Sequence, residues 1–259
     1  MALFLFVIRA VAVIVWIVLG LATELLVFPA LRRSARRSVV RGWSRGLMVL
    51  CGVHLQVMGQ PVLQGPVLWV SNHVSWVDIF AFNSVRTTSF VAKSDIRRWP
   101  VIGLLVAWAG TLFIDRGHRQ AVRQASQQMQ DCFTQGDAVG LFPEGTTTEG
   151  LDLLPFHAGL FDAAVQAQVA VQPVALRFMR GARRAPELAF VGEQTLVANL
   201  WWLLGATRVR VECEFLPLIP VSAQSQRGTL AHQARAAIRQ KILPSGEGPA
   251  VTPGRGTEQ

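Results

Sequence analysis

The chain has 259 residues, of which 51% are hydrophobic, with a mean hydropathy of +0.35 and a formal net charge of +9. This length suffices for one large domain with a full core, and the hydropathy is high for a soluble enzyme. The cysteines Cys51, Cys132 and Cys213 are odd in number and widely spaced, with no C-x-x-C pair, which argues against a disulfide framework or a zinc site.

The N-terminal segment is strongly apolar. Between residues 3 and 31 the only ionisable side chains are Arg9 and Glu24, and the uncharged core at 10–23 has 14 residues, fewer than the ~20 that span a bilayer. We expect a helix that is embedded in the membrane or crosses it marginally. A signal peptide is the competing interpretation, but no clear small-residue cleavage site precedes Pro29, and the paired arginines follow the apolar run.

A cluster of arginines follows at once. Its members are Arg32, Arg33, Arg36, Arg37, Arg41 and Arg45. Positive charge in this place favours the cytoplasmic side of a membrane and attracts anionic head groups. Nucleic acid is not an expected partner, because no zinc-finger spacing or RNP-type motif accompanies the arginines. A second, amphipathic helix at 38–53 is expected beside the first, with Trp43 at the interface, so residues 1–50 are expected to form membrane-embedded or membrane-associated helices.

Beyond Gly52 strands and helices alternate. Strands are predicted at 55–58, 67–71, 89–92, 111–114, 137–141, 169–178 and 208–215, and helices at 119–134, 161–168, 196–204 and 229–242. The expected fold class is α/β, a mixed sheet flanked by helices over residues 51–243. Residues 244–259, rich in proline, glycine and polar side chains, are expected to be a disordered tail.

The first candidate site is the segment Asn72-His73-Val74-Ser75-Trp76-Val77-Asp78, directly after the strand predicted at 67–71. A carboxylate five residues after a histidine can hold one ring nitrogen while the other acts as a base, provided that the segment turns back on itself. A histidine with an ordinary structural partner at a strand end is the alternative. A nucleophilic Ser75 is disfavoured because no G-x-S-x-G elbow surrounds it, and a metal site is disfavoured because no third ligand has a recognisable spacing.

The second candidate site is Phe142-Pro143-Glu144-Gly145-Thr146. Residues 140–146 begin like a phosphate-binding loop, but Thr146 stands where that loop needs its lysine, so nucleotide hydrolysis is rejected. Proline and glycine instead bracket Glu144 in a tight turn, which is either an ordinary turn or one that aims a carboxylate and an amide into a cleft.

A third candidate is Arg116, at the end of the strand predicted at 111–114. Its guanidinium is placed to bind a phosphate with two hydrogen bonds, and an ion pair with Asp115 is the alternative.

In chain order, residues 72–78, Leu112-Phe113-Ile114-Asp115-Arg116, residues 142–146 and Gln172-Pro173-Val174 resemble the conserved blocks of the glycerolipid acyltransferases of the 1-acylglycerol-3-phosphate acyltransferase type. The resemblance covers roughly residues 50–220 and implies the glycerolipid acyltransferase fold. It implies acyl transfer from acyl-CoA or acyl carrier protein to a lysolipid hydroxyl, with no covalent acyl-enzyme, no bound cofactor and no metal.

The resemblance also assigns roles to the candidate residues. His73 and Asp78 are expected to be catalytic, as the base and the residue that holds its ring. Arg116 is expected to bind the acceptor's phosphate. The remaining expected substrate-binding residues are Glu144, Gly145 and Thr146, the first two of which also stabilise the oxyanion.

Two positions depart from the best-known members of that family. Thr147 stands where they carry an arginine, and His157 stands where they commonly carry a lysine. Lysophosphatidic acid is the expected acceptor, giving phosphatidic acid, with lyso-ornithine lipid or another lysophospholipid as the alternative.

The expected location is the inner membrane, with the catalytic domain facing the cytoplasm. A non-catalytic lipid-binding protein is the alternative from another class, but it gives no reason for His73, Asp78 and Glu144 to lie at strand ends.

Overall fold

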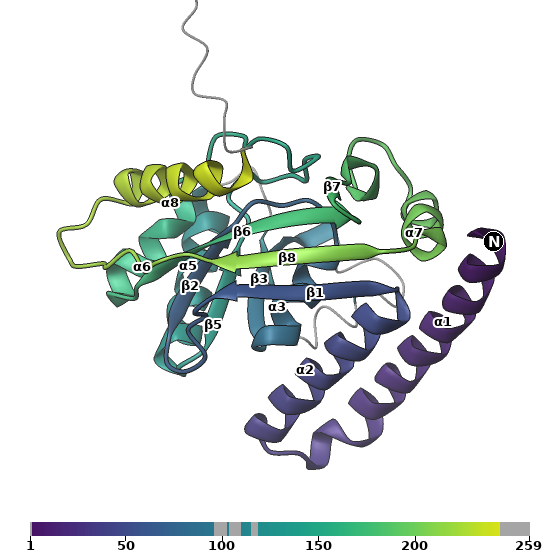
Figure 1. Ribbon diagram of the computed structural model, residues 1–259. Coiled ribbons are helices and arrows are strands. Elements are labelled where there is room, and N and C mark those ends of the chain that lie inside the picture. Colours follow the sequence, from purple (N-terminus) through teal and green to yellow (C-terminus); the bar gives the residue numbers. More distant parts are fainter. Residues whose placement is uncertain (1, 96–102, 104–109, 115–118, 244–259) are drawn as a thin grey trace, which may run out of the picture.

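The computed structural model describes residues 2–95, 103, 110–114 and 119–243. Within them, one mixed sheet forms the centre of the protein (Figure 1). Its strands are β1 (Val53–Gly59), β2 (Val67–Ser71), β3 (Thr88–Lys93), β4 (Leu112–Ile114), β5 (Ala138–Leu141), β6 (Val171–Arg180), β7 (Arg183–Arg184) and β8 (Val209–Phe215). The order is β1-β8-β6-β2-β5-β3-β4, with β7 paired to β6. The strands from β6 to β4 run parallel, whereas β8 and β1 run opposite to them, so the prediction of a mixed sheet is confirmed.

Helices cover both faces of the sheet. On one face lie α1 (Ala2–Leu26), α2 (Arg33–Leu50), α3 (Val77–Val85) and α7 (Leu196–Gly205), and on the other α5 (Arg119–Thr134), α6 (Asp162–Ala167) and α8 (Arg227–Ile242). Strand β2 shows why. Its Val67 and Trp69 pack into the core on the first face, which α1 covers, and its Leu68 and Val70 pack into the core on the second face, which α5 covers. A strand buried on both faces reads as the continuous apolar run seen in the sequence.

The short connections are one-turn helices at Phe28–Ala30, Gly159–Phe161 and Pro186–Leu188. Helix α3 and strand β7 were not predicted, and α2 begins earlier than the predicted residue 38. Helix α3 lacks an amphipathic pattern because nearly all of its residues are buried, polar Asn83 and Ser84 included. The predicted tail lies outside the described residues, and the domain limits at residues 50 and 243 stay predictions.

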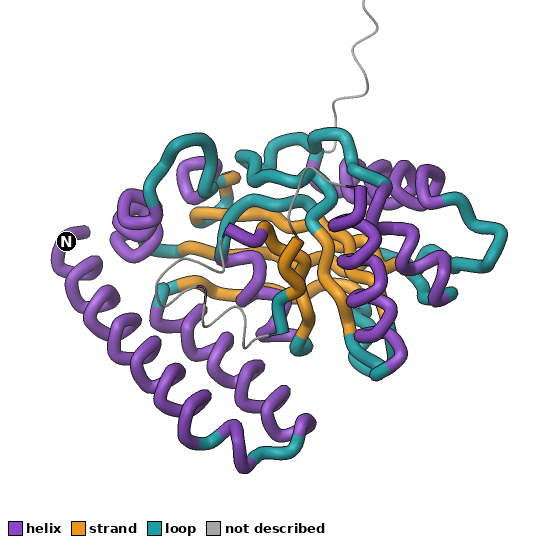
Figure 2. Tube along the Cα trace, turned by 180° about the vertical axis from the view of Figure 1, so that it is seen from behind, coloured by secondary structure: helices purple, strands orange, loops and turns teal. Residues whose placement is uncertain are grey.

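The two N-terminal helices form a hairpin against the first face, which Figure 2 shows from behind. Helix α1 is long and apolar enough to cross a bilayer, judged by length and composition. Its Arg9 reaches into the protein, where Nη1 donates to the carbonyl oxygens of Leu204 (3.0 Å) and Ala206 (2.6 Å). The one cation in the apolar segment is therefore paired with the end of α7.

Candidate active site

The histidine segment forms a loop from the carboxyl end of β2 to the start of α3. Asn72, which is fully buried, fastens the loop to the neighbouring strand β6: its Oδ1 accepts from Leu176 N (2.8 Å) and its Nδ2 donates to Leu176 O (3.0 Å). His73 therefore emerges at the carboxyl edge of the parallel strands, where α/β proteins place their ligands.

His73 and Asp78 meet as predicted. His73 Nδ1 lies 2.8 Å from Asp78 Oδ2, which also accepts from the backbone amides of Val74 (2.7 Å) and Ser75 (3.0 Å). Asp78 is fully buried in the first turn of α3, where the helix dipole favours a negative charge. The carboxylate favours the tautomer that carries its proton on Nδ1, and Nε2, which has no hydrogen-bond partner among the described residues, is left to act as a base.

An aromatic stack fixes the plane of the imidazole. The His73 and Phe142 rings are 4.1 Å apart and nearly parallel at 10°, and Phe142 stacks in turn on Phe90 at 5.4 Å and 8°. Neither phenylalanine has a role that was expected from the sequence. The only available signal was the place of Phe142 directly before the turn that holds Glu144.

The turn at 142–146 lies against the histidine loop. Glu144 is 4% exposed, and its two carboxylate oxygens accept from the backbone amides of His73 and Leu154, both at 2.9 Å. Burial raises the pKa of the Glu144 carboxyl above its usual range, although these two amides oppose the shift. Gly145 has φ +75°, a conformation that favours glycine, and its amide donates to Phe142 O. In this structure Glu144 thus holds the backbone of the histidine loop.

The other candidate residues are placed differently. Thr146 is exposed at the turn, whereas Ser75 is fully buried, a poor place for a nucleophile. Two positions depart from the pattern of the resembled family, Thr147 and His157. Thr147 follows the turn directly, and its Oγ1 donates to Phe190 O. The amide of His157 donates to Pro143 O of the turn at 2.9 Å. Arg116 lies outside the described residues, so its role stays a prediction.

Residues 188–205 also hold the histidine loop in place, a role that was not predicted from the sequence. Asn199 of α7 is fully buried; its Oδ1 accepts from Trp76 Nε1 of the histidine loop (2.9 Å), and its Nδ2 donates to Ala189 O (3.1 Å). The amide of Phe190 donates to Val74 O at 2.9 Å. The available signal was a lone amide side chain inside the apolar sequence of α7.

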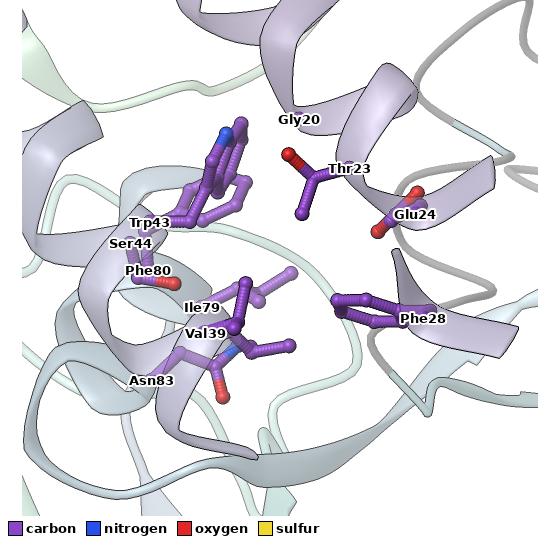
Figure 3. Close-up of a pocket in the computed structure, with 11 residues that line it drawn as sticks. Gly20, Thr23, Glu24, Phe28, Val39, Trp43, Ser44, Ile79, Phe80 and Asn83 are labelled. Atoms are coloured by element: carbon purple, nitrogen blue, oxygen red, sulfur yellow. The ribbon is translucent and has the colours of Figure 1, made fainter. Parts of the chain in front are cut away.

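An apolar pocket lies between α1, α2 and α3 (Figure 3). Figure 3 shows Ile79 and Phe80 of α3 in its wall together with Glu24 of α1 and Trp43 of α2. Its lining includes no residue of the loop at 72–78 or of the turn at 142–146, so it belongs to the junction of the hairpin with the body. Within the described part of the chain, no group of three or more histidine, cysteine or acidic side chains could hold a metal ion.

Known proteins are similar to this chain. The family model described as Acyltransferase matches residues 54–177. The lyso-ornithine lipid O-acyltransferase of Pseudomonas aeruginosa is 38% identical over 204 residues, which cover 79% of this chain and 78% of that protein. This chain belongs to the acyltransferase family. As the sequence predicted, it is an acyltransferase of the glycerolipid type.

A second relative and one solved structure are also similar to this chain. The 1-acyl-sn-glycerol-3-phosphate acyltransferase of Neisseria meningitidis serogroup B is 36% identical to this acyltransferase over 211 residues, 80% of this chain and 81% of that protein. The crystal structure of the 1-acyl-sn-glycerophosphate (LPA) acyltransferase PlsC from Thermotoga maritima matches with a TM-score of 0.68 at 18% identity, covering 93% of this chain and 94% of that chain. The predicted fold is thereby confirmed.

Proposed function

We propose that this acyltransferase moves an acyl chain from the thioester of CoA or acyl carrier protein to the free hydroxyl of a lysolipid at the membrane, with His73 as the general base. One observation carries the proposal: His73 Nδ1 is held at 2.8 Å by the buried Asp78, and Nε2 has no hydrogen-bond partner among the described residues. The ring is thus oriented at the carboxyl edge of the sheet, and the tautomer with its proton on Nδ1 leaves Nε2 able to accept a proton.

The reaction follows from this geometry. Nε2 takes the hydroxyl proton as the oxygen attacks the thioester carbonyl, and Asp78 stabilises the imidazolium that forms. The tetrahedral intermediate collapses with cleavage of the C–S bond, and the imidazolium returns the proton to the leaving thiolate. The acyl chain passes directly to the acceptor, so no acyl-enzyme is needed and the burial of Ser75 is no obstacle.

The remaining proposed roles concern the acceptor. We assign Glu144 a positioning role through the His73 amide, beside its expected role in acceptor binding. We assign the exposed Thr146 and the turn at Gly145 to contacts with the acceptor and the oxyanion. Arg116 is the proposed phosphate ligand.

The first proposed acceptor is 1-acylglycerol-3-phosphate, which gives phosphatidic acid in phospholipid biosynthesis. The second is lyso-ornithine lipid, which has no phosphate; it is favoured by Thr147, which replaces the expected arginine and donates to Phe190 O. Relatives carry both names: the Brucella abortus protein, 32% identical over 250 residues (90% of this chain and 94% of that protein), is a lyso-ornithine lipid O-acyltransferase. The proposed location is the inner membrane with the site facing the cytoplasm, where both thioester donors occur.

The test is a competition assay. Purified protein in detergent receives acyl-CoA or acyl carrier protein with both lysolipids, and mass spectrometry identifies the diacyl products. Product formation is expected with wild type and with His232→Ala, an exposed histidine of α8, and is expected to vanish in His73→Ala without loss of folding. Activity of His73→Ala near that of wild type would refute the mechanism, and the ratio of the two products decides between the acceptors.

A further inference from the structure

Helix α7 exposes an apolar face. The exposed fractions are 72% for Val197, 42% for Trp201 and 52% for Trp202. The ten residues of this helix include no charged side chain. Its polar Asn199 points the other way, into the protein, where it is fully buried. Large apolar side chains gathered on one exposed helix face mark a contact surface.

Helix α7 is joined to helix α1. The rings of Phe6 and Trp201 have centroids 4.7 Å apart, and Arg9 donates to two carbonyl oxygens at the carboxyl end of α7, those of Leu204 and Ala206. A cation at that end also complements the helix dipole. Figures 1 and 2 both show α7 beside the N-terminal half of α1. One ring contact and two hydrogen bonds therefore hold the two helices together.

The exposed face of α1 is apolar along its whole length. Phe4, Val7, Val11, Ile14 and Val18 recur at helical spacing, each between 49% and 68% exposed. No charged side chain interrupts this stripe, because Arg9 is used inside the protein. Phe6, on the half-buried side of the same helix, joins α1 to Trp201 of α7.

We propose that α7 is a second membrane-contacting element, which together with α1 forms one lipid-facing surface that we term the α1–α7 surface. The occupant is a lipid bilayer, because the stripe of α1 is as apolar as a membrane helix and two tryptophans lie at its edge, the residue type enriched at the membrane–water interface. The inference rests on the proposed function and deepens it. Asn199, on the buried face of α7, accepts a hydrogen bond from Trp76 of the histidine loop, so α7 links the bilayer contact to the loop that carries His73.

The first test measures partition of the full-length protein onto phosphatidylethanolamine–phosphatidylglycerol vesicles by flotation. In the double variant Val197→Ser/Trp202→Ser, we expect partition to fall at least about tenfold, since two large apolar side chains no longer leave water for the apolar part of the bilayer. The matched control is Leu63→Ser/Leu218→Ser, which removes two exposed apolar side chains from loops (56% and 47% exposed) and should change partition less than about twofold.

Several outcomes would overturn the proposal. Partition equal to that of wild type would do so, as would a double variant that changes only the oligomeric state, because a second copy of the chain would then cover the face. Partition needs no turnover. A wild type that binds vesicles through α7 and transfers no acyl chain would therefore refute the proposed function alone.

A labelling experiment avoids any loss of folding. Val197→Cys in a Cys132→Ser background places an environment-sensitive fluorophore on α7, since Cys51 and Cys213 are buried. We expect a blue shift on addition of vesicles, and none for Leu218→Cys in the same background. A label at position 197 that does not respond to vesicles would contradict the proposal.

Discussion

Trp16 of α1 and Trp43 of α2 hydrogen bond to each other's backbone. Trp16 Nε1 donates to Trp43 O at 3.0 Å, and Trp43 Nε1 donates to Trp16 O at 3.2 Å. Each indole lies against a glycine of the opposite helix, Gly46 for Trp16 and Gly20 for Trp43. This reciprocal arrangement locks the hairpin and so sets where α1, with its apolar stripe, lies relative to the active site.

Alanine at Gly46 should loosen the hairpin. A Cβ there would overlap the ring of Trp16, which the two hydrogen bonds hold in place, so we expect a loss of about 1–3 kcal/mol in unfolding free energy. Gly42 lies on the same helix, where no atom of the described residues comes within 4 Å of an added Cβ, and Gly42→Ala should gain up to about 1 kcal/mol from helix propensity. Thermal unfolding in detergent compares the two variants, and equal midpoints would argue against the lock.

Asp78→Asn should separate charge from geometry. The amide oxygen can take the place of Oδ2 and keep its three contacts, while the amide nitrogen takes the place of Oδ1, which has no partner in the described structure. The imidazolium then loses its counter-charge, and we expect kcat to fall about 10²–10⁴-fold, with KM little changed. Steady-state kinetics at saturating donor tests this. A loss confined to KM would point to a role in binding instead.

Phe142→Leu should release the imidazole plane. The ring contact is worth about 1 kcal/mol, so we expect kcat to fall roughly fivefold or more, while Asp78 still holds Nδ1. Phe156→Leu, a half-buried phenylalanine in the other core, is the control for lost packing. Comparable kcat values for the two variants would mean that the stack does not serve catalysis.

Asn199 should act on catalysis through Trp76. In Asn199→Leu the indole N–H loses its acceptor, and we expect kcat to fall while the variant stays folded. A double-mutant cycle with Trp76→Phe, calculated from the kcat values of the four proteins, should give a coupling energy of about 0.5–1.5 kcal/mol. Additive effects of the two substitutions would show that α7 does not position the histidine loop.

The pH dependence of stability should report on Glu144. Burial raises its pKa in the folded protein, so above the usual value of 4.5 the native state keeps a proton that the unfolded chain has released. In that window the free energy of unfolding falls as the pH rises. The stability of wild type relative to Glu144→Gln should therefore decline with rising pH, measured by denaturant unfolding at a series of pH values. A difference that rises with pH would mean that the amide contacts outweigh burial.

Many helices and strands of this fold could be predicted from local patterns in the sequence. The apolar runs at β2, β5 and β6 and the polar helix α5 were predictable, because burial on both faces or on one face leaves a direct trace in the sequence. Helix α3 left no such trace, since even its polar Asn83 is buried, where its Oδ1 accepts from Thr88 N.

By itself the sequence determined an α/β enzyme with an apolar N-terminus, and it placed the segment of His73 and Asp78 and the segment of Glu144 directly after strands, because such motifs are short and contiguous. Tertiary structure alone decided what those residues touch. Glu144 reaches the His73 amide across 71 residues, Asn199 reaches Trp76 across 123, and Arg9 reaches Leu204 across 195. Contacts at such separations depend on the order of strands and the packing of helices, and these arise from burial of the whole core and not from any one segment.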